Sequence, residues 1–224
     1  MRAAPRYTPL RPDDLARVIG SIPEDVRNLL EDYPRRLFVA GGAVRCAITG
    51  EAPGDIDLFG EEEVVRAACA GWRSTAEQHV SERAITVQSP GRLPVQFITG
   101  WSDTNAEQLL DRFDFRCCQA AAWRSGKGWA SVAAEGFYED LAGRRLFYTS
   151  RAAENDDSVG GTLARVVAMA GQGWKIDPVS LAAVAMRFVH GAEDLQEKGS
   201  DMTPADAAMH FGKSYSQSGR SRWQ

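Results

Sequence analysis

The chain has 224 residues, 44% of them hydrophobic and 25% charged, and a formal net charge of −4 at pH 7. This size allows one large or two small domains with a sizeable core, and the composition is ordinary for a globular protein. The acidic balance excludes a basic nucleic-acid-binding surface that covers the whole protein, so any RNA or DNA contact requires a local patch.

The sequence contains no run of about 18 apolar residues, so we expect no transmembrane helix, and its N-terminus lacks the apolar block of a signal peptide. The four cysteines, Cys46, Cys69, Cys117 and Cys118, have no CxxC spacing. This spacing favours reduced, buried thiols over a disulfide or zinc framework. We therefore expect a cytoplasmic protein without a membrane partner.

Two helices are predicted before the first core strand. Pro12 and the acids that follow it are typical of a helix start, and Ile22–Asp32 has apolar residues at helical spacing. Pro34 ends the second helix, and the apolar run Leu37–Ala40 predicts a buried strand.

A pair of glycines follows this strand and opens a helix over Ala43–Thr49. Because Gly41 and Gly42 have no Cβ, the backbone there can approach a phosphate closely or take a positive φ. The N–H groups of a helix N-terminus favour an anion, and Arg45, one turn into the helix, can lie near the same anion. The pattern indicates a phosphate site.

The next strand carries Asp55 and Asp57 on either side of Ile56. Side chains two residues apart share a face of a strand, so both carboxylates point to one side while Ile56 packs behind them. Mg²⁺ prefers carboxylate oxygens together with substrate phosphates. We expect these two carboxylates to hold Mg²⁺ (or Mn²⁺) beside the glycines, with a nucleoside triphosphate (NTP) as the substrate.

Helices and antiparallel strands then alternate along the chain. They are a helix from Gly60, a hairpin of Ala84–Gln88 with Leu93–Thr99, a helix over Asn105–Arg112, and a hairpin of Phe115–Trp123 with Trp129–Val132. This mixture predicts an α+β fold with a mixed sheet. After Thr149 only helices are predicted, over Gly161–Ala170, Pro178–His190 and Pro204–Phe211.

The change of pattern predicts a domain boundary near Arg151. We expect a head domain over residues 1–150, a helical domain over residues 151–212 and a flexible tail over residues 213–224. Arg220, Arg222 and Trp223 make this tail a candidate for nucleic-acid contact, although such a terminus is more often a solvated end.

The segment GGAVR, followed by the DxD strand, resembles the nucleotidyltransferase superfamily headed by DNA polymerase β. It is most similar to the branch of poly(A) polymerases and CCA-adding enzymes, whose signature is GGAVRD before DxD. Three later segments resemble further motifs of that branch in the same order: Leu109–Trp123, Phe137–Tyr148 and Thr162–Asp177. The resemblance implies a polymerase β-like head with a mixed sheet, followed by a small all-helical neck domain.

Three residues depart from the pattern of the branch. Cys46 replaces the Asp that follows GGAVR, Phe113 replaces the second of two arginines before Asp-Phe, and Gln96 is neutral where many relatives have a third acid. The neck helix keeps Arg165 but lacks most of the arginines of the branch. Contacts with phosphate and base are therefore fewer, while the pair of carboxylates is retained.

The resemblance implies that Asp55 and Asp57 are the catalytic residues and the metal ligands. It assigns nucleotide binding to the other matched residues, with both glycine N–H groups on the phosphates: Gly41, Gly42, Arg45, Arg112, Asp114 and Arg165. Alternatives remain for two of them. Arg112 can hold the triphosphate or pair with Asp111 or Asp114. Asp114 can orient an arginine or a metal-bound group, or it can cap local backbone N–H groups.

The implied function is metal-dependent, template-independent transfer of a nucleoside monophosphate from an NTP to an RNA 3′ end. One alternative is a nucleotidyltransferase that modifies a non-RNA acceptor, or a toxin-type tRNA modifier. Another is a degenerate homologue that binds nucleotide or RNA without catalysis. Cys46, Gln96 and Phe113 favour degeneration, whereas the intact carboxylates argue against it.

Overall fold

The structure is a computed structural model that describes residues 7–72, 76–149 and 161–197, the last eight of these by their backbone alone. Two compact units are present. The first contains the residues up to Phe113 together with Cys118–Phe137, and the second contains Asp114–Cys117 together with the residues from Tyr138 onward. The predicted boundary near residue 151, the predicted helix over 204–211 and the predicted tail lie outside the described residues.

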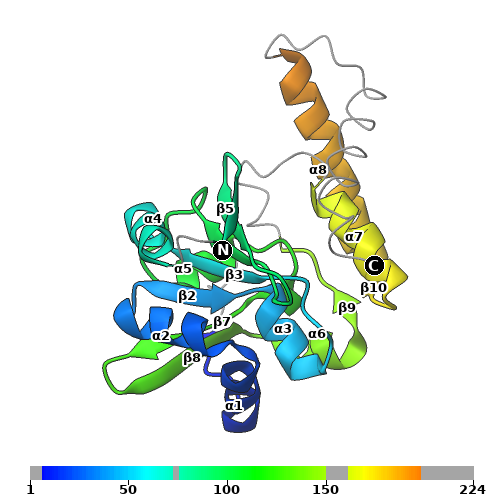
Figure 1. Cartoon of the computed structure of the whole chain (residues 1–224). Helices are drawn as coiled ribbons and strands as arrows, with labels where there is room; N and C mark the ends of the chain where they lie inside the picture. The colour runs from blue at the N-terminus through cyan, green and yellow to red at the C-terminus, as the bar shows by residue number, and fades with distance from the viewer. Residues whose placement is uncertain (1–6, 73–75, 150–160, 198–224) are drawn as a thin grey trace. The chain divides into compact units, whose positions relative to one another are not determined.

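The first unit is built on an eight-stranded mixed sheet (Figure 1). Its strands are β1 (Tyr7–Thr8), β2 (Leu37–Ala40), β3 (Ile56–Gly60), β4 (Glu77–Val80), β5 (Ala84–Gln88), β6 (Val95–Ile98), β7 (Ala120–Ser125) and β8 (Gly128–Ala134). They lie in the order β1-β8-β7-β2-β3-β6-β5-β4. Strands β3 and β6 are parallel, and the other neighbouring pairs are antiparallel. The predicted mixed sheet is therefore confirmed.

Five helices belong to the first unit as described: α1 (Pro12–Ser21), α2 (Glu24–Asp32), α3 (Gly42–Thr49), α4 (Glu62–Gly71) and α5 (Ala106–Asp111). Their ends follow from local chemistry. Pro12 occupies the first turn of α1 with two acids, and the Asn105 side chain accepts a hydrogen bond from the Gln108 N–H at 2.9 Å to cap α5. Gly50, with φ of +76°, ends α3 in the left-handed region.

The register of the strands divides the core between the two faces of the sheet. Val39 lies opposite Leu58, which lies opposite Phe97, so these three buried side chains share one face. Trp72, directly after α4, packs on Phe97 with the ring centroids 5.6 Å apart. The other face carries Phe38 opposite Phe59, and α5 packs against it with its buried leucines.

The second unit is mainly helical. It contains most of α6 (Phe137–Gly143), the helices α7 (Gly161–Gly171) and α8 (Pro178–Glu197), and a parallel pair of short strands, β9 (Arg145–Leu146) and β10 (Lys175–Ile176). Helices α7 and α8 lie side by side (Figure 1). The α+β class with a helical part after the sheet agrees with the fold predicted from the sequence.

One predicted strand is wrong in its first half. The sequence predicts a continuous strand over Phe115–Trp123, but residues Arg116–Cys118 form a 3₁₀ turn and β7 begins at Ala120. Long-range partners cause the difference. The Arg116 side chain donates two hydrogen bonds to Asp140, and the Gln119 amide donates to the Leu110 carbonyl at 2.9 Å. These hydrogen bonds turn the chain before the strand starts.

Candidate functional site

The two predicted metal ligands lie at the start of β3, where a buried apolar residue separates them. Asp55 precedes the strand and Asp57 is inside it, while Ile56 is only 2% exposed. Strand β2 runs antiparallel to β3, with Phe38 opposite Phe59. The end of β2, which leads into Gly41, therefore lies beside the start of β3. The fold thus brings the carboxylates and the glycine pair to one end of these two strands.

Gln96 is the nearest residue of the adjacent strand β6 to this carboxylate pair. It lies opposite Asp57 in the parallel register, so the two side chains share a face of the sheet. The position where the branch has a third acid is thus present in the fold, but it carries an amide. Two carboxylates and one amide carbonyl form a set of hard oxygen donors.

This donor set fits Mg²⁺. Among the residues that the structure describes, no group of three or more His, Cys, Asp and Glu side chains could hold a metal ion. Mg²⁺ does not require such a cage, because it is commonly bound by one or two carboxylates, substrate phosphates and water. Asp55 and Asp57 supply the two carboxylates, so the residues present are those that a nucleotide-bound Mg²⁺ uses.

Gly41 has a structural role that differs from the expected one. Its N–H donates to the Ala120 carbonyl at 3.1 Å, so this N–H already has a backbone acceptor in the sheet. Its φ is +72°, and a Cβ built on it would lie 2.7 Å from Cε1 of Phe113. Gly41 is required by the backbone conformation and by the ring that covers it. A Cβ on Gly42 would meet nothing within 4 Å, so this side of the helix start is open.

The N-terminus of α3 still offers backbone donors to an anion. Arg45 N–H makes the first hydrogen bond of the helix, to the Gly41 carbonyl at 3.1 Å. The N–H groups of Gly42, Ala43 and Val44 therefore belong to the first turn, where the helix itself provides no acceptors. This is the part of the predicted phosphate site that the structure supports.

The Arg45 guanidinium lies between two thiols. Its Nη1 is 3.2 Å from the Cys118 sulfur and its Nη2 is 3.7 Å from the Cys46 sulfur. Burial raises the pKa of the Cys46 thiol, and the neighbouring Arg45 offsets this only in part. The thiol therefore stays protonated at neutral pH and leaves the positive charge of Arg45 intact. All four cysteines are buried, as predicted, and none of them forms a disulfide in the structure.

Arg112 pairs with a residue that the sequence did not indicate. Its Nε is 2.8 Å from a carboxylate oxygen of Asp103, whose side chain is 5% exposed. Neither Asp111 nor Asp114 is this partner. The separation of nine residues places Asp103 in the loop before α5, and no periodic pattern relates that loop to the end of the helix.

Phe113 belongs to a cluster of three aromatic rings. Its centroid is 5.6 Å from that of Phe59 and 5.4 Å from that of Trp101. Phe59 is two residues beyond Asp57 on the same face of β3. An apolar surface therefore stands beside the carboxylates, where the branch has the second arginine.

Asp114 and Arg165 form an ion pair within the second unit. Arg165 Nε is 2.6 Å from the Asp114 carboxylate, which is buried, while the Arg165 side chain is 48% exposed. Of the two roles considered for Asp114, orientation of an arginine has a direct contact. The other six predicted residues, namely Gly41, Gly42, Arg45, Asp55, Asp57 and Arg112, belong to the first unit.

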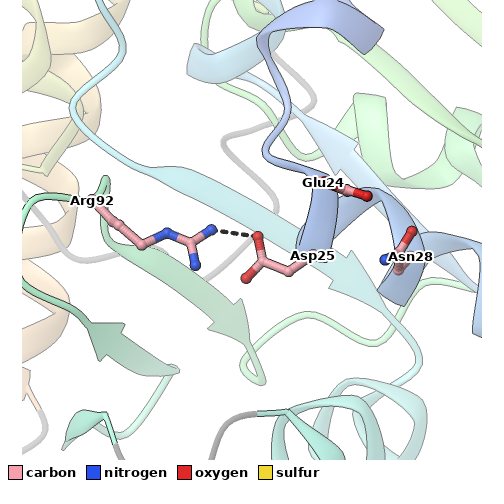
Figure 2. Close-up of a pocket in the computed structure, with 4 residues that line it drawn as sticks. All are labelled: Glu24, Asp25, Asn28 and Arg92. Carbon is pink, nitrogen blue, oxygen red and sulfur yellow. Dashed lines mark hydrogen bonds and ion pairs between the residues drawn. The ribbon is translucent and has the colours of Figure 1, made fainter.

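A separate recess of about 400 Å³ lies between α2 and the loop before β6. Figure 2 shows its lining: Arg92 reaches across to the Asp25 carboxylate, and Glu24 and Asn28 lie on the same helix. None of these residues is a predicted site residue. The ion pair between Arg92 and Asp25 occupies two of its three charged groups, and Glu24 is the third.

A family model described as Gabija anti-defense 2 family protein matches residues 14–144. No curated protein sequence matches the chain. In the part of the chain that the structure covers, no helix is long and apolar enough to cross a membrane.

Solved structures similar to this one are nucleotidyltransferases. A Thermotoga maritima CCA-adding enzyme complexed with tRNA has a TM-score of 0.58 at 14% identity and covers 92% of this chain and 54% of its own. A CCA-adding enzyme with ATP gives 0.58 at 14% identity, covering 92% and 55%. A tRNA-processing enzyme with CTP gives 0.52 at 18%, covering 72% and 45%. The likeness shows a nucleotidyltransferase-like fold, and the chain spans about half the length of these proteins.

Proposed function

The chain belongs to the Gabija anti-defense 2 family, and from that premise we propose that it is a metal-dependent nucleotidyltransferase that moves a nucleoside monophosphate from an NTP to an RNA 3′ end. The observation that carries the proposal is the placement of Asp55 and Asp57 beside the open N-terminus of α3, in a nucleotidyltransferase-like fold. The description of the family supports the further proposal that this transfer counters Gabija defense.

Asp55 and Asp57 would hold Mg²⁺ or Mn²⁺, with the Gln96 carbonyl as a further oxygen donor. When bound, the metal supplies positive charge for the phosphates and for the attacking and leaving oxygens. The fixed positions of the two carboxylates would determine where the metal and the reacting phosphate are held. Ile56 locks the strand between them into the core, which keeps the two side chains in place.

The triphosphate is assigned to the start of α3 and to Arg45. The first-turn N–H groups of this helix point out of its N-terminus, and their partial positive charge favours an anion. Two Nη atoms of Arg45 contact the thiols of Cys118 and Cys46 at the side of this helix. Arg112 stays a proposed nucleotide-binding residue, and binding through its Nη groups is compatible with the Nε contact to Asp103.

Ligands of the similar structures support the choice of substrates. Those proteins were solved with CTP, with ATP and with tRNA. By transfer to this chain, an NTP is the proposed donor and an RNA end the proposed acceptor. Asp114 and Arg165 stay proposed nucleotide-binding residues, as the resemblance to the CCA-adding branch implies.

A second candidate is a degenerate member that binds nucleotide without transferring it. Two observations favour it. Phe113 places an aromatic ring over Gly41 where the branch has an arginine, and Gln96 removes a negative charge beside Asp57. Both changes weaken interactions that the branch uses for phosphate and metal.

The direct test is incubation of the full chain with each labelled NTP, Mg²⁺ or Mn²⁺, and total RNA. We expect label on RNA, and its loss in the Asp55→Ala/Asp57→Ala variant. An Asp13→Ala/Asp32→Ala variant removes two exposed acids from the helices α1 and α2 and serves as the matched control. It should keep full activity, and circular dichroism should show that both variants fold.

Other outcomes separate the candidates. Label on protein or on a small molecule, with the same dependence on Asp55 and Asp57, would identify a non-RNA acceptor. Tight Mg²⁺-dependent NTP binding without any labelled product would favour the non-catalytic candidate. In cells that carry Gabija, loss of the anti-defense effect in the double variant would tie transfer to the role in the family name.

A further inference from the structure

Two cations face each other on the small sheet of the second unit. Strands β9 and β10 are parallel, with Lys175 opposite Arg145 and Ile176 opposite Leu146. Leu146 is 1% exposed, so it points inward, whereas Arg145 and Lys175 are both exposed. Like charges directly opposite each other on a sheet are unfavourable unless an anion lies between or above them.

A single buried carboxylate holds the arginines of this region in place. Asp140 is 0% exposed and receives two hydrogen bonds from Arg116, at 2.6 and 3.0 Å. Arg145 lies 3.2 Å from the same carboxylate. One negative charge is thus shared by two guanidinium groups, and the surface above it keeps a positive excess. Because Asp140 already holds the side chains of Arg116 and Arg145 in place, little side-chain entropy is lost when they bind an anion.

An exposed aromatic ring continues the same surface. Phe147 is 44% exposed and follows Arg145 by two residues, with Leu146 turned inward between them. The guanidinium carbon of Arg116 lies 4.2 Å from the centroid of this ring, and the Arg116 N–H donates to the Phe147 carbonyl at 3.0 Å. Hydrogen bonding to Asp140 raises the pKa of Arg116, so this arginine keeps its charge.

The four cations named near this surface, Arg116, Arg144, Arg145 and Lys175, outnumber the three acids, Asp140, Asp177 and Glu139. Asp177 follows Lys175 by two residues, but its carboxylate accepts hydrogen bonds from the N–H groups of Val179 and Ser180 at the start of α8. Glu139 lies on α6, next to the buried Asp140, and is exposed. Arg144, also exposed, adds a further cation directly before β9.

We propose that Arg116, Arg145, Phe147 and Lys175, here called the β9 surface, bind single-stranded RNA. The cations contact successive phosphates, and Phe147 stacks with an unpaired base, which is the combination that single-strand binders use. A duplex keeps its bases in the helix and cannot use the ring. The inference rests on the proposed function only in the choice of RNA, since an RNA end is the proposed acceptor.

The test is fluorescence anisotropy of a labelled 12-nucleotide single-stranded RNA with the full chain, without NTP or metal. Lys175→Glu should weaken binding at least about tenfold and lower the slope of log K against log salt by roughly 0.7 for each phosphate that the variant no longer neutralises. The matched control is Lys127→Glu, a charge reversal at an exposed lysine between β7 and β8, which should leave both quantities unchanged. Equal effects of the two reversals would overturn the inference.

Stacking is tested separately from charge. Phe147→Leu keeps an apolar side chain but removes the ring, and it should weaken binding about tenfold with an unchanged salt slope. Phe147→Trp should restore the affinity. Tighter binding of a duplex RNA of the same length, or no effect of Phe147→Leu, would contradict the proposal. No binding of RNA at all would also overturn it, in favour of an acidic protein partner.

The same variants separate this inference from the proposed function. RNA binding that depends on the β9 surface and persists in Asp55→Ala/Asp57→Ala supports the inference, whether or not label is transferred. If label is transferred to RNA and Lys175→Glu alters neither binding nor transfer, the β9 surface is not the RNA site, and the proposed function stands without it.

Discussion

At the residue scale, the ring of Phe113 and the absence of a side chain at Gly41 depend on each other. The ring of Phe113 occupies the volume that any side chain at position 41 would need, and the positive φ of Gly41 disfavours a side chain for a separate reason. Gly42, the next residue, has neither constraint. A double glycine that looks uniform in the sequence therefore contains one residue required by the fold and one that leaves space for a ligand.

Gly41→Ala should lower the free energy of unfolding by roughly 2–4 kcal/mol, because left-handed backbone and overpacking against Phe113 both oppose it. Gly42→Ala should change that free energy by less than about 1 kcal/mol. Urea unfolding of both variants measures the difference. If the ring contributes, adding Phe113→Leu to Gly41→Ala should recover part of the stability. Equal stability of Gly41→Ala and Gly42→Ala would show that the conformation described for Gly41 is not the one in solution.

Individual residues differ in how far the sequence predicts them. Asp55 and Asp57 could be placed on one face of a strand because the two-residue period is local and Ile56 marks the buried side. The ion-pair partners of charged residues could not be predicted from the sequence. Asp103 for Arg112 and Asp140 for Arg116 come from other elements, and only the folded chain brings them together.

At the scale of elements, the sequence predicted correctly those strands whose apolar residues pack into the core. Strands β2 and β5 have the predicted bounds, because each is a short run with an apolar face that packs into the core. Strand β4 was not predicted, since all four of its residues are exposed and have no apolar face. Strands β9 and β10, of two residues each, are too short to show a period.

The start of α8 depends on one carboxylate. Asp177 accepts hydrogen bonds from Val179 N–H at 3.0 Å and Ser180 N–H at 2.9 Å, and Pro178 takes the first helical position. Asp177→Ala should destabilise the protein by about 1 kcal/mol at pH 7, whereas Asp177→Asn should keep most of the cap. Thermal unfolding by circular dichroism compares them. Equal destabilisation in both variants would mean that the cap is not the contribution removed.

The same residue predicts a pH dependence. Hydrogen bonds from Ser180 lower the pKa of Asp177 in the folded state, so its contribution is present above the pKa of the unfolded chain and is lost as the pH falls through the lowered folded-state value. The stability difference between the native chain and Asp177→Ala should therefore shrink in acid. Asp177→Asn keeps the cap but not the charge, so the stability difference between the native chain and this variant should fall to zero in acid. A difference that grows in acid would contradict the assignment.

At the scale of the whole molecule, a nucleotide held through a metal should stabilise the first unit. An NTP at about 100 times its Kd adds about 2.7 kcal/mol, which for a chain of this size raises Tm by roughly 5–10 °C. The rise should need Mg²⁺, so that EDTA removes it, and Asp57→Asn should not show it. Differential scanning fluorimetry measures all three. A rise of Tm of the same size in EDTA would show that nucleotide binding does not depend on a metal held by Asp55 and Asp57.

The chain passes between its two units three times, after Phe113, after Cys117 and after Phe137. No single truncation point in the chain therefore yields either unit intact. A fragment that stops at residue 150 keeps Asp114 and loses the Arg165 that pairs with it, and the remaining fragment lacks the strap formed by Asp114–Cys117. A chimera that exchanges the second unit between relatives must therefore also exchange these four residues. They are remote from the rest of that unit in the sequence but belong to it in the structure.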